Sequence, residues 1–496
     1  MAIRARLSAP REDPERWPWH HAKWTALSAA LIFGGDRRME AENYLSGGYG
    51  IRLALEARKT GWMRLGELAR VWQPSRLKGI QVSPEFGTPF LAATQVFDQR
   101  PVPRKFLSLD RTDSSAERFV SSGTILVTCS GSVGRATLAY TAHEQILISH
   151  DLLRVEPQQD ELWGWLYAYL RAGQTRAMMS AVQYGHVIKH LEVSHLNALP
   201  MPVLRDDLLA DFSRRVHLVL DQRRRAHELA LAAEARFAEC FGPLTDTDSG
   251  ETGFSVRASE ALFSSRRRFD ALPHNPMAKS IRSHASKRAR GFTKLIEAGY
   301  SIWLPNRFKR VPAEDGVDLM DSSSMYEINP DVARKIAEVD FGDPYNGRVS
   351  AGWMLMSRSG QTYGLLGTLT LATEAYAGKV ISDDVMRIAP PEKPTMRSGY
   401  AYVALSHPTL GRPLVKSLAY GSSIPHIDVA DMEQLEVVRI DEAEENAIAD
   451  MAEEASAMRA KADILENDLA ADAEAILERF MAGDMQDVVV TKRGSS

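Results

Sequence analysis

The chain carries one series of short motifs twice, in the same order, and this duplication restricts its possible folds more than any other feature. The pattern Trp-x-Pro-x-Arg-[Leu/Phe]-Lys begins at Trp72 and again at Trp303. Three further pairs of similar segments begin at Ser121 and Ser350, Ile148 and Ile381, and Tyr184 and Tyr420. Four collinear matches at nearly constant spacing predict two copies of a domain-sized module rather than short solenoid repeats.

Each copy has the pattern of a mixed domain. Residues 124–128 predict a buried strand after a glycine turn, and 355–356 repeat it. Residues 148–155 predict another strand. Apolar and aromatic residues at 163–170 predict a helix, and the similar segment at 400–405 predicts the equivalent helix in the second copy. Short strands mixed with short helices favour an α+β fold over a doubly wound sheet.

Each copy ends in a long segment without glycine or proline, at 206–241 and at 442–481. Both segments carry apolar residues at alternating steps of three and four, the heptad pattern, interrupted by Arg223 and by Asp472. The first stripe is Phe212, Val216, Val219, Ala226, Ala230, Ala233, Phe237 and Cys240, and the second is Met451, Ala455, Met458, Ala462, Leu465, Leu469, Ile476 and Phe480. Arginines enrich the first segment and carboxylates the second, so we expect the two helices to pair. The alternative is that each helix packs on its own domain.

Composition excludes several classes of protein. Two cysteines, Cys129 and Cys240, form neither a disulfide framework nor a paired zinc motif, and they favour a reducing cytoplasm. Residues 1–13 have no apolar run and no stretch of 18 apolar residues exists, so neither a signal peptide nor a membrane span is expected. The formal net charge is −4, so any contact with nucleic acid must come from local basic clusters.

Catalytic motifs are missing from the sequence. No P-loop and no HExxH motif occurs, and 275–277 and 343–345 are only fragments of the motif with which amino-methyltransferases hold their target amine. The glycines at 47–50 favour a flexible entry into a helix over a nucleotide loop. His190 and His426 recur at equivalent positions, which favours a structural hydrogen bond over a catalytic role.

With these motifs in order, the chain resembles the specificity subunits of type I restriction–modification systems over residues 38–481. The motifs that carry the resemblance are Gly-x-Ile-Leu-Val and Ser-Gly-Ser-Val-Gly-Arg within 123–135, Ile-Ser-His-Asp at 148–151, Gly-x-x-Ile-x-His-Leu at 185–191 and Leu-Pro-Met-Pro at 199–202. The second copy departs from them at 361–363 and at 436–437.

The resemblance implies an α+β chain with two tandem, pseudo-twofold-related target-recognition domains, each followed by a long helix, the helices pairing as an antiparallel coiled coil. The expected segments are an N-terminal extension (1–36), target-recognition domain 1 (37–203), spacer helix 1 (204–241), a linker (242–265), target-recognition domain 2 (266–440), spacer helix 2 (441–482) and a C-terminal tail (483–496). The extension, with Trp17, Trp19 and Trp24, lies outside the match and is a candidate partner-binding element.

The resemblance also implies a non-catalytic subunit that recognises a bipartite, asymmetric target in double-stranded DNA. It would hold two copies of a DNA adenine methyltransferase and, in some complexes, a restriction/translocase subunit. The chain itself would use no cofactor and no metal, whereas partner subunits would use S-adenosylmethionine, ATP and Mg²⁺. The alternatives are a specificity subunit of a related methylation-based phage-defence system, a protein scaffold that does not read DNA, and an enzyme with an unrecognised active site.

Candidate DNA contacts fall into two groups. Cations shared by the copies predict phosphate contacts, because the DNA backbone is the same at both half-sites; they are Arg76 and Lys78, with Arg104 and Lys105 nearby, and Arg307 and Lys309, with Arg310 nearby. Polar turn residues that differ predict base contacts, with arginine suited to guanine and glutamine to adenine; they are Ser130, Ser132, Arg135, His186 and Lys189, and Ser359, Gln361, Tyr363, Ser422 and Ser423. The alternative for both groups is an ordinary solvated surface.

Overall fold

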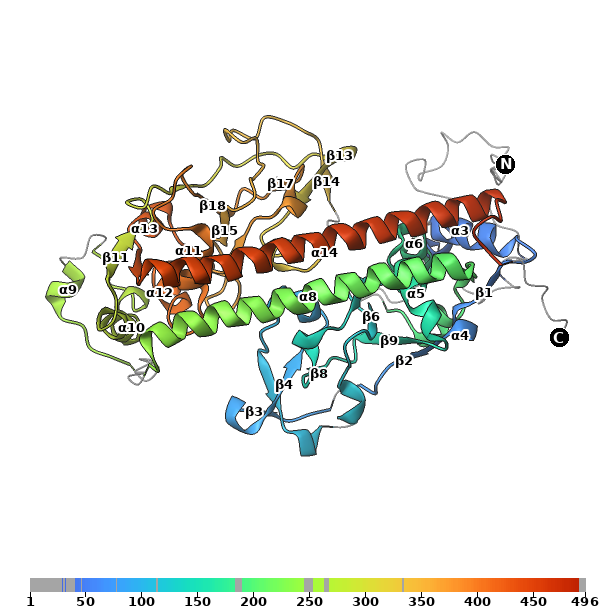
Figure 1. Cartoon of the computed structure of the whole chain (residues 1–496), viewed down its shortest axis with the longest axis horizontal. Helices are drawn as coiled ribbons and strands as arrows, with labels where there is room; N and C mark the ends of the chain where they lie inside the picture. The colour runs from blue at the N-terminus through green and yellow to red at the C-terminus, as the bar shows by residue number, and fades with distance from the viewer. Residues whose placement is uncertain are drawn as a thin grey trace, which may run out of the picture. The chain divides into compact units, whose positions relative to one another are not determined.

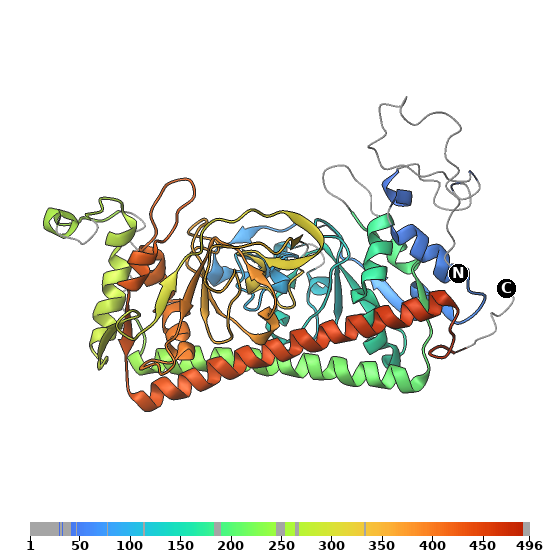
Figure 2. The same cartoon turned by 90° about the horizontal axis from the view of Figure 1, so that it is seen from above.

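The computed structural model (Figures 1 and 2) describes residues 29, 32, 41–45, 47–76, 78–112, 115–182, 190–244, 253–262, 267–331 and 334–489. The chain divides into two compact units. Unit 1 comprises residues 1–221 with 464–496, and unit 2 comprises 222–463. Both boundaries fall within long helices, so each unit contains part of each. The expected N-terminal extension lies outside the described residues, apart from Ala29 and Ile32.

Unit 1 is built on two four-stranded sheets and one strand pair. The first sheet is antiparallel, in the order β2 (Ala69–Trp72), β9 (Leu152–Pro157), β6 (Ile125–Thr128) and β7 (Ala136–Leu138). The second has the order β3 (Gln81–Val82), β5 (Lys105–Leu107), β4 (Thr88–Leu91) and β8 (Leu147–Ile148), with β4 and β8 parallel. β1 (Trp62–Arg64) pairs with β10 (Pro200–Pro202). The helices are α2 (Glu42–Leu45), α3 (Gly47–Glu56), α4 (Leu65–Leu68), α5 (Trp163–Arg171), α6 (Gly173–Val182) and α7 (Val193–Asn197).

Unit 2 repeats the strand order of the antiparallel sheet and the separate strand pair, whereas its second sheet has three strands in the described residues. Its antiparallel sheet has the order β12 (Ser301–Trp303), β18 (Val385–Ala389), β15 (Met354–Ser357) and β16 (Leu369–Leu371). A second sheet has the order β14 (Lys335–Ile336), β13 (Pro312–Met320) and β17 (Val380–Ile381), with β13 and β17 parallel, and β11 (Gly291–Lys294) pairs with β19 (Glu436–Arg439). The helices are α9 (Ala258–Leu262), α10 (Pro276–Ser286), α11 (Ser398–Ser406), α12 (Arg412–Ser417) and α13 (Val429–Glu433). The repeated strand order agrees with the motif duplication and with a fold of mixed helices and strands.

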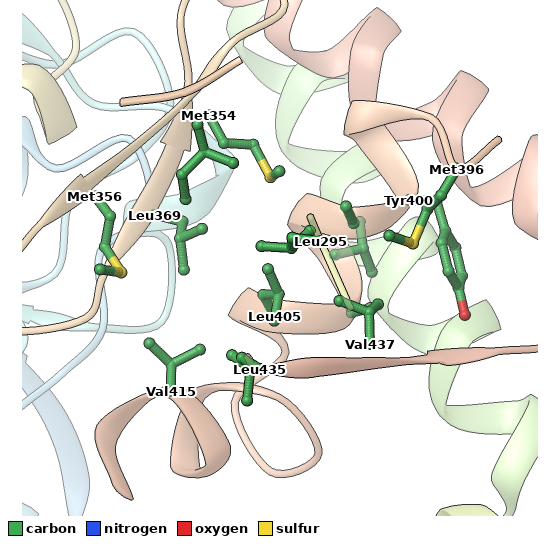
Figure 3. Close-up of a cluster of buried hydrophobic side chains, with 14 of the residues drawn as sticks. Leu295, Met354, Met356, Leu369, Met396, Tyr400, Leu405, Val415, Leu435 and Val437 are labelled. Carbon is green, nitrogen blue, oxygen red and sulfur yellow. The ribbon is translucent and has the colours of Figure 1, made fainter. Parts of the chain in front are cut away.

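A buried tyrosine joins a helix to the strand pair in each unit, and in unit 2 an apolar core surrounds this contact. In unit 2, side chains from β15, β16, α11 and β19 gather in one cluster (Figure 3), which includes Met354, Leu369 and Val437. The Tyr400 hydroxyl donates a hydrogen bond to the Val438 carbonyl at 2.6 Å. In unit 1 the Tyr169 hydroxyl on α5 donates to the Pro200 carbonyl on β10 at 2.9 Å. The helices predicted at 163–170 and 400–405 are thus confirmed and tied to equivalent strands.

The two long segments are helices, as predicted: α8 (Asp206–Phe241) and α14 (Glu442–Ala482). Within unit 2 their parts run side by side (Figures 1 and 2). Salt bridges from Arg223 to Asp463 and from Arg236 to Glu444 show that the two helices run in opposite directions. Within unit 1, Arg215 on α8 contacts Asp472 on α14 at 2.6 Å. The helices therefore pair within each unit rather than packing only on their own sheets.

The two residues that interrupt the apolar stripes both form salt bridges between the long helices. Arg223 is 2% exposed and takes part in the buried ion pair with Asp463. Asp472 is exposed and forms the salt bridge with Arg215. Six predicted stripe positions on α8 are buried, namely Phe212, Val216, Val219, Ala226, Ala233 and Phe237. On α14 the buried ones are Ala455, Ala462, Leu469, Ile476 and Phe480.

Each unit docks a short helix on a long one through glycine. On α11, a Cβ at Gly399 would lie 2.6 Å from the Ala449 carbonyl oxygen of α14. On α5, a Cβ at Gly164 would lie 2.3 Å from the Ser213 backbone nitrogen of α8. Real side chains do not tolerate such distances, so glycine allows the backbones to approach.

One strand prediction is wrong. Residues 148–155 do not form a continuous strand, because a turn at 149–151 separates β8 from β9. Ser149 Oγ donates to the Asp151 carboxylate at 3.0 Å and accepts from the Asp151 backbone N–H at 3.1 Å. These local bonds compete with the ladder for the backbone groups of the segment. Within the described part of the chain, no helix is both long enough and apolar enough to span a bilayer.

Candidate nucleic-acid interface

A buried arginine fixes the turn between β8 and β9 in unit 1. The Arg154 side chain is fully buried, and its guanidinium donates to the carbonyls of Ser149 at 3.0 Å and Ile148 at 3.2 Å, and to that of Leu152. Burial lowers the pKa of Arg154 to about 10, so the group remains protonated at neutral pH. The turn is thus held by a cation that the sheet encloses.

Arg387 on β18 fixes the equivalent turn of unit 2, which precedes this strand. It is fully buried and donates to the carbonyls of Ser382 at 2.7 Å, Val385 at 2.6 Å and Ile381 at 2.8 Å. Burial again lowers the pKa to about 10. Sequence reasoning missed both arginines, although the motif Ile-Ser-x-Asp-x-x-Arg occurs in both copies.

The turn in each unit binds the loop that follows the central strand. Ser130 Oγ donates to Asp151 Oδ1 at 3.0 Å in unit 1, and Ser359 Oγ donates to Asp384 Oδ1 at 3.0 Å in unit 2. Both hydroxyls thus donate to a carboxylate of their own unit. A contact from either serine to DNA would therefore come from oxygen lone pairs.

The recurring histidines lie beside these serines. His190 forms a backbone bridge with Ser130, and His426 forms one with Ser359. His426 Nδ1 also lies 3.1 Å from the Ile424 carbonyl oxygen. The structural role that the recurrence favours is confirmed for His426.

We call the loop after the central strand of each sheet the first reading loop; it covers residues 130–135 in unit 1 and 359–364 in unit 2. Its other candidates in unit 1 are Ser132 and Arg135. Ser132 is exposed, and its carbonyl accepts a hydrogen bond from Thr128 Oγ1 at 2.5 Å. The Arg135 guanidinium stacks on the Phe97 ring, 3.8 Å from its centroid. The ring restricts the direction of this side chain. His186 and Lys189, the candidates of the second loop, lie outside the described residues.

The structure brings one of the predicted phosphate contacts of unit 1 close to the turn. Arg76 and Lys78 are exposed in the segment after β2. Burial, together with the charges of Arg118, Arg76 and Arg154, lowers the pKa of His150 in the turn, against the opposing effect of Asp151. The positive charge of Arg76 thus opposes protonation of His150 in this turn.

Two more predicted cations of unit 1, Arg104 and Lys105, are exposed at the start of β5. They belong to the second sheet rather than to the sheet that carries Arg76. The structure therefore distributes the predicted cations of unit 1 over both sheets.

In unit 2 the equivalent cations follow β12. Arg307 and Lys309 are exposed. Arg310 instead donates to Asp383 Oδ1 at 2.6 Å and to Ser382 Oγ at 3.0 Å, so its charge is partly neutralised within the unit. Of the three, Arg307 and Lys309 fit a phosphate contact better.

The two reading loops of unit 2 are joined. Gln361 Nε2 donates to the Ser423 carbonyl at 3.0 Å. Gln361, Ser422 and Ser423 are exposed, and Tyr363 is 79% exposed. Four predicted base contacts are thus exposed on two loops that this hydrogen bond joins. Ile424, which is 65% exposed on the same loop, was missed, because nothing in its local sequence distinguishes it from a core residue.

The chemistry of the described residues is that of hydrogen bonding and charge. No group of three or more His, Cys, Asp or Glu side chains among them could hold a metal ion. Burial raises the pKa of the Cys129 thiol to about 11, so it is not a thiolate at neutral pH. The arrangement offers exposed donors and acceptors on fixed loops, beside exposed cations.

Comparison with solved structures finds restriction–modification proteins. An S subunit of a type I restriction–modification system from M. genitalium is 13% identical, with 88% of this chain and 98% of that chain covered and a TM-score of 0.28. The HsdS subunit from Thermoanaerobacter tengcongensis is 12% identical, with 85% and 96% covered and a TM-score of 0.25. The type IIG restriction endonuclease BpuSI is 14% identical over 35% of this chain and 28% of its own, with a TM-score of 0.26.

No family model and no curated protein matches the chain. The solved structures that align with most of the chain include an S subunit of a type I restriction–modification system and an HsdS subunit.

Proposed function

We propose that the chain is the DNA sequence-recognition subunit of a type I-like restriction–modification complex. It binds a bipartite, asymmetric target and positions methyltransferase subunits on it. One observation carries the proposal: the units repeat a sheet topology and a buried arginine turn, while exposed loop residues at equivalent strand ends differ.

A shared scaffold with different loops is what two readers of different half-sites need. Base edges in the major groove are distinguished by donors, acceptors and the thymine methyl group. After the equivalent serines Ser130 and Ser359, unit 1 presents Gly-Ser-Val-Gly-Arg and unit 2 presents Gly-Gln-Thr-Tyr-Gly. Two identical recognition domains would select a palindromic target, whereas two different domains select an asymmetric pair of half-sites.

The exposed cations supply the contacts that do not depend on sequence. Arg76 and Lys78 follow β2, and Arg307 and Lys309 follow the equivalent β12. Contacts with phosphate fix the position of a protein on the duplex, and base contacts select the sequence. Cations at the same place in both units fit the first role.

We assign the role of spacer to α8 and α14, paired as an antiparallel coiled coil that follows two tandem target-recognition domains. A helix of 36 residues, such as α8, is about 54 Å long at about 1.5 Å per residue. Half-sites one turn apart on DNA lie about 34–36 Å from each other. The length of the helices is therefore sufficient to set a gap of this size.

The partners in this proposal are two copies of a DNA adenine methyltransferase and, in some complexes, a restriction/translocase subunit. S-adenosylmethionine, ATP and Mg²⁺ would be used by those subunits. The chain contributes hydrogen-bond donors, acceptors and charge, and carries out no chemistry of its own.

Sequencing of methylated bases in cells with and without the gene tests the proposal. We expect a two-part motif with a fixed gap that disappears on deletion. A methylation pattern unchanged by deletion contradicts the proposal. Methylation by the purified chain alone, with S-adenosylmethionine, would identify it as an enzyme instead.

Variants of unit 2 test the assignment of contacts. Arg307→Ala should weaken binding of the complex to all sequences alike and lower the slope of log K against log salt by about 1. Lys393→Ala, at an exposed lysine after β18, is the matched control and should change neither. Binding to DNA that does not depend on salt would favour a scaffold that does not read DNA.

A further inference from the structure

The second reading loop of unit 2 is closed at its base by backbone hydrogen bonds. Tyr420 and His426 exchange two such bonds, at 3.0 and 2.9 Å. The Gly360 N–H donates to the Pro425 carbonyl at 3.0 Å, and the Ile427 N–H donates to the Arg358 carbonyl at 3.0 Å. The loop tip at 421–425 is therefore held against the first reading loop at 359–364.

The hydrogen bond from Gln361 orients its amide. A primary amide has two N–H donors and one carbonyl acceptor. One N–H of Gln361 is used by the Ser423 carbonyl at 3.0 Å, and the side chain is exposed. The second N–H and the carbonyl oxygen are left for other partners. Adenine presents a matching pair in the major groove, the N7 acceptor and the N6 donor. Fixing the amide in advance reduces the entropy cost of binding.

An exposed apolar surface adjoins this amide. Ile424 is 65% exposed on the closed tip, and Tyr363 is 79% exposed on the neighbouring loop. A single exposed apolar residue is ordinary. Here two lie on loops that the Gln361–Ser423 bond joins. The apolar group on base edges in the major groove is the 5-methyl of thymine.

We propose that this surface reads an A·T pair in the half-site bound by unit 2. Gln361 binds N6 and N7 of adenine, and Ile424 packs against a thymine 5-methyl group. The inference depends on the proposed function and deepens it, because it names the base pair and adds Ile424 as a residue that determines specificity.

Selection from randomised DNA duplexes tests the inference. The full chain, with the methyltransferase subunits that co-purify with it, is offered a pool made with thymidine and a pool made with deoxyuridine, which lacks the methyl group. We expect the thymidine pool to yield a two-part motif with an A·T pair in one half. In the deoxyuridine pool the preference at that pair should fall about fourfold, the effect of losing one buried methyl group.

Two variants separate the contacts. Gln361→Ala should reduce the preference for the A·T pair about tenfold to a hundredfold and leave the other half unchanged. Ile424→Ala should show the same preference in both pools. The matched controls are Gln434→Ala and Ile296→Ala, exposed residues of the same types in unit 2, which should behave like the wild type.

The possible failures are distinguishable. Absence of any enriched motif would contradict the proposed function itself. A two-part motif that Gln361→Ala leaves unchanged, or a difference between pools that persists in Ile424→Ala, would overturn only the A·T assignment. An unchanged motif together with a lower yield of assembled complex would identify the surface as a protein-docking site, and would also overturn it.

Discussion

Replacing Asp463 with asparagine removes one charge of a buried ion pair and changes little else. Asp463 Oδ1 lies 2.9 Å from Arg223 Nη2, and the two side chains are 8% and 2% exposed. The same oxygen accepts the Asn329 backbone N–H at 2.9 Å. Asparagine has nearly the same shape and keeps an oxygen acceptor. The variant therefore tests the effect of removing the Asp463 charge beside the buried Arg223 guanidinium.

Burial determines the expected magnitude. Removing one partner of a buried ion pair costs about 3–5 kcal/mol, because the other charge remains away from water. Arg223→Met alone should cost a similar amount. The double variant Arg223→Met/Asp463→Asn removes both charges, so its unfolding free energy should be equal to that of the wild type or higher. An exposed pair on the same helices, Arg225 and Glu454, is 53% and 52% exposed and serves as the control, with an expected effect below about 1 kcal/mol.

Amide hydrogen exchange measures the two units separately. Peptides from β15 report the free energy of unfolding of unit 2, and peptides from β6 report that of unit 1. The single variants should speed exchange in β15 by about two to four powers of ten, given about 1.4 kcal/mol per factor of ten. A loss below about 1 kcal/mol in Asp463→Asn, or a double variant as unstable as the singles, would refute the reasoning.

Three further outcomes are expected. Arg154→Met removes this donor from three carbonyls in unit 1, and at about 1–3 kcal/mol for each it should lower the stability of β9, measured by hydrogen exchange, by about 3 kcal/mol or more. Tyr400→Phe leaves the Val438 carbonyl without this donor and should cost about 1–3 kcal/mol in chemical denaturation of unit 2. The folded-state pKa of His150 is lowered, so the unfolded chain binds its proton more readily; stability should fall as pH decreases from about 6.5 through the lowered pKa. His150→Asn should make thermal unfolding less dependent on pH in that window, and an unchanged dependence would contradict the assignment.

Periodic and repeated features of the sequence could be predicted. The helices α8 and α14 follow from long segments without glycine or proline, and α5 and α11 follow from matching apolar runs. The repeated sheet order agrees with motifs that recur in sequence, such as those at Trp72 and Trp303. Patterns of this kind depend on local propensity and burial, which the sequence expresses directly.

Features that depend on distant partners could not be predicted. Arg223 interrupts an apolar stripe, and its burial is explained by a tertiary partner, Asp463, that lies 240 positions away. The turn at 149–151 depends on bonds between side chains and backbone that a strand pattern does not reveal. Ile424 becomes a candidate contact because its loop is hydrogen-bonded to Gln361. Gln361 lies 63 positions earlier in the chain, so no local sequence pattern reveals this neighbourhood.

The buried arginine of each unit has a consequence for how such a protein changes over generations. Arg387 and the carbonyls it binds hold the strands of unit 2, whereas the exposed side chains of Gln361, Tyr363 and Ile424 lie beyond them. Mutations at the loop tips therefore leave the groups that secure the fold intact. Under the proposed function, a unit would acquire a new base preference by few substitutions and at little risk of misfolding. Tolerance to mutation and diversity of recognition would then arise from the same separation of parts.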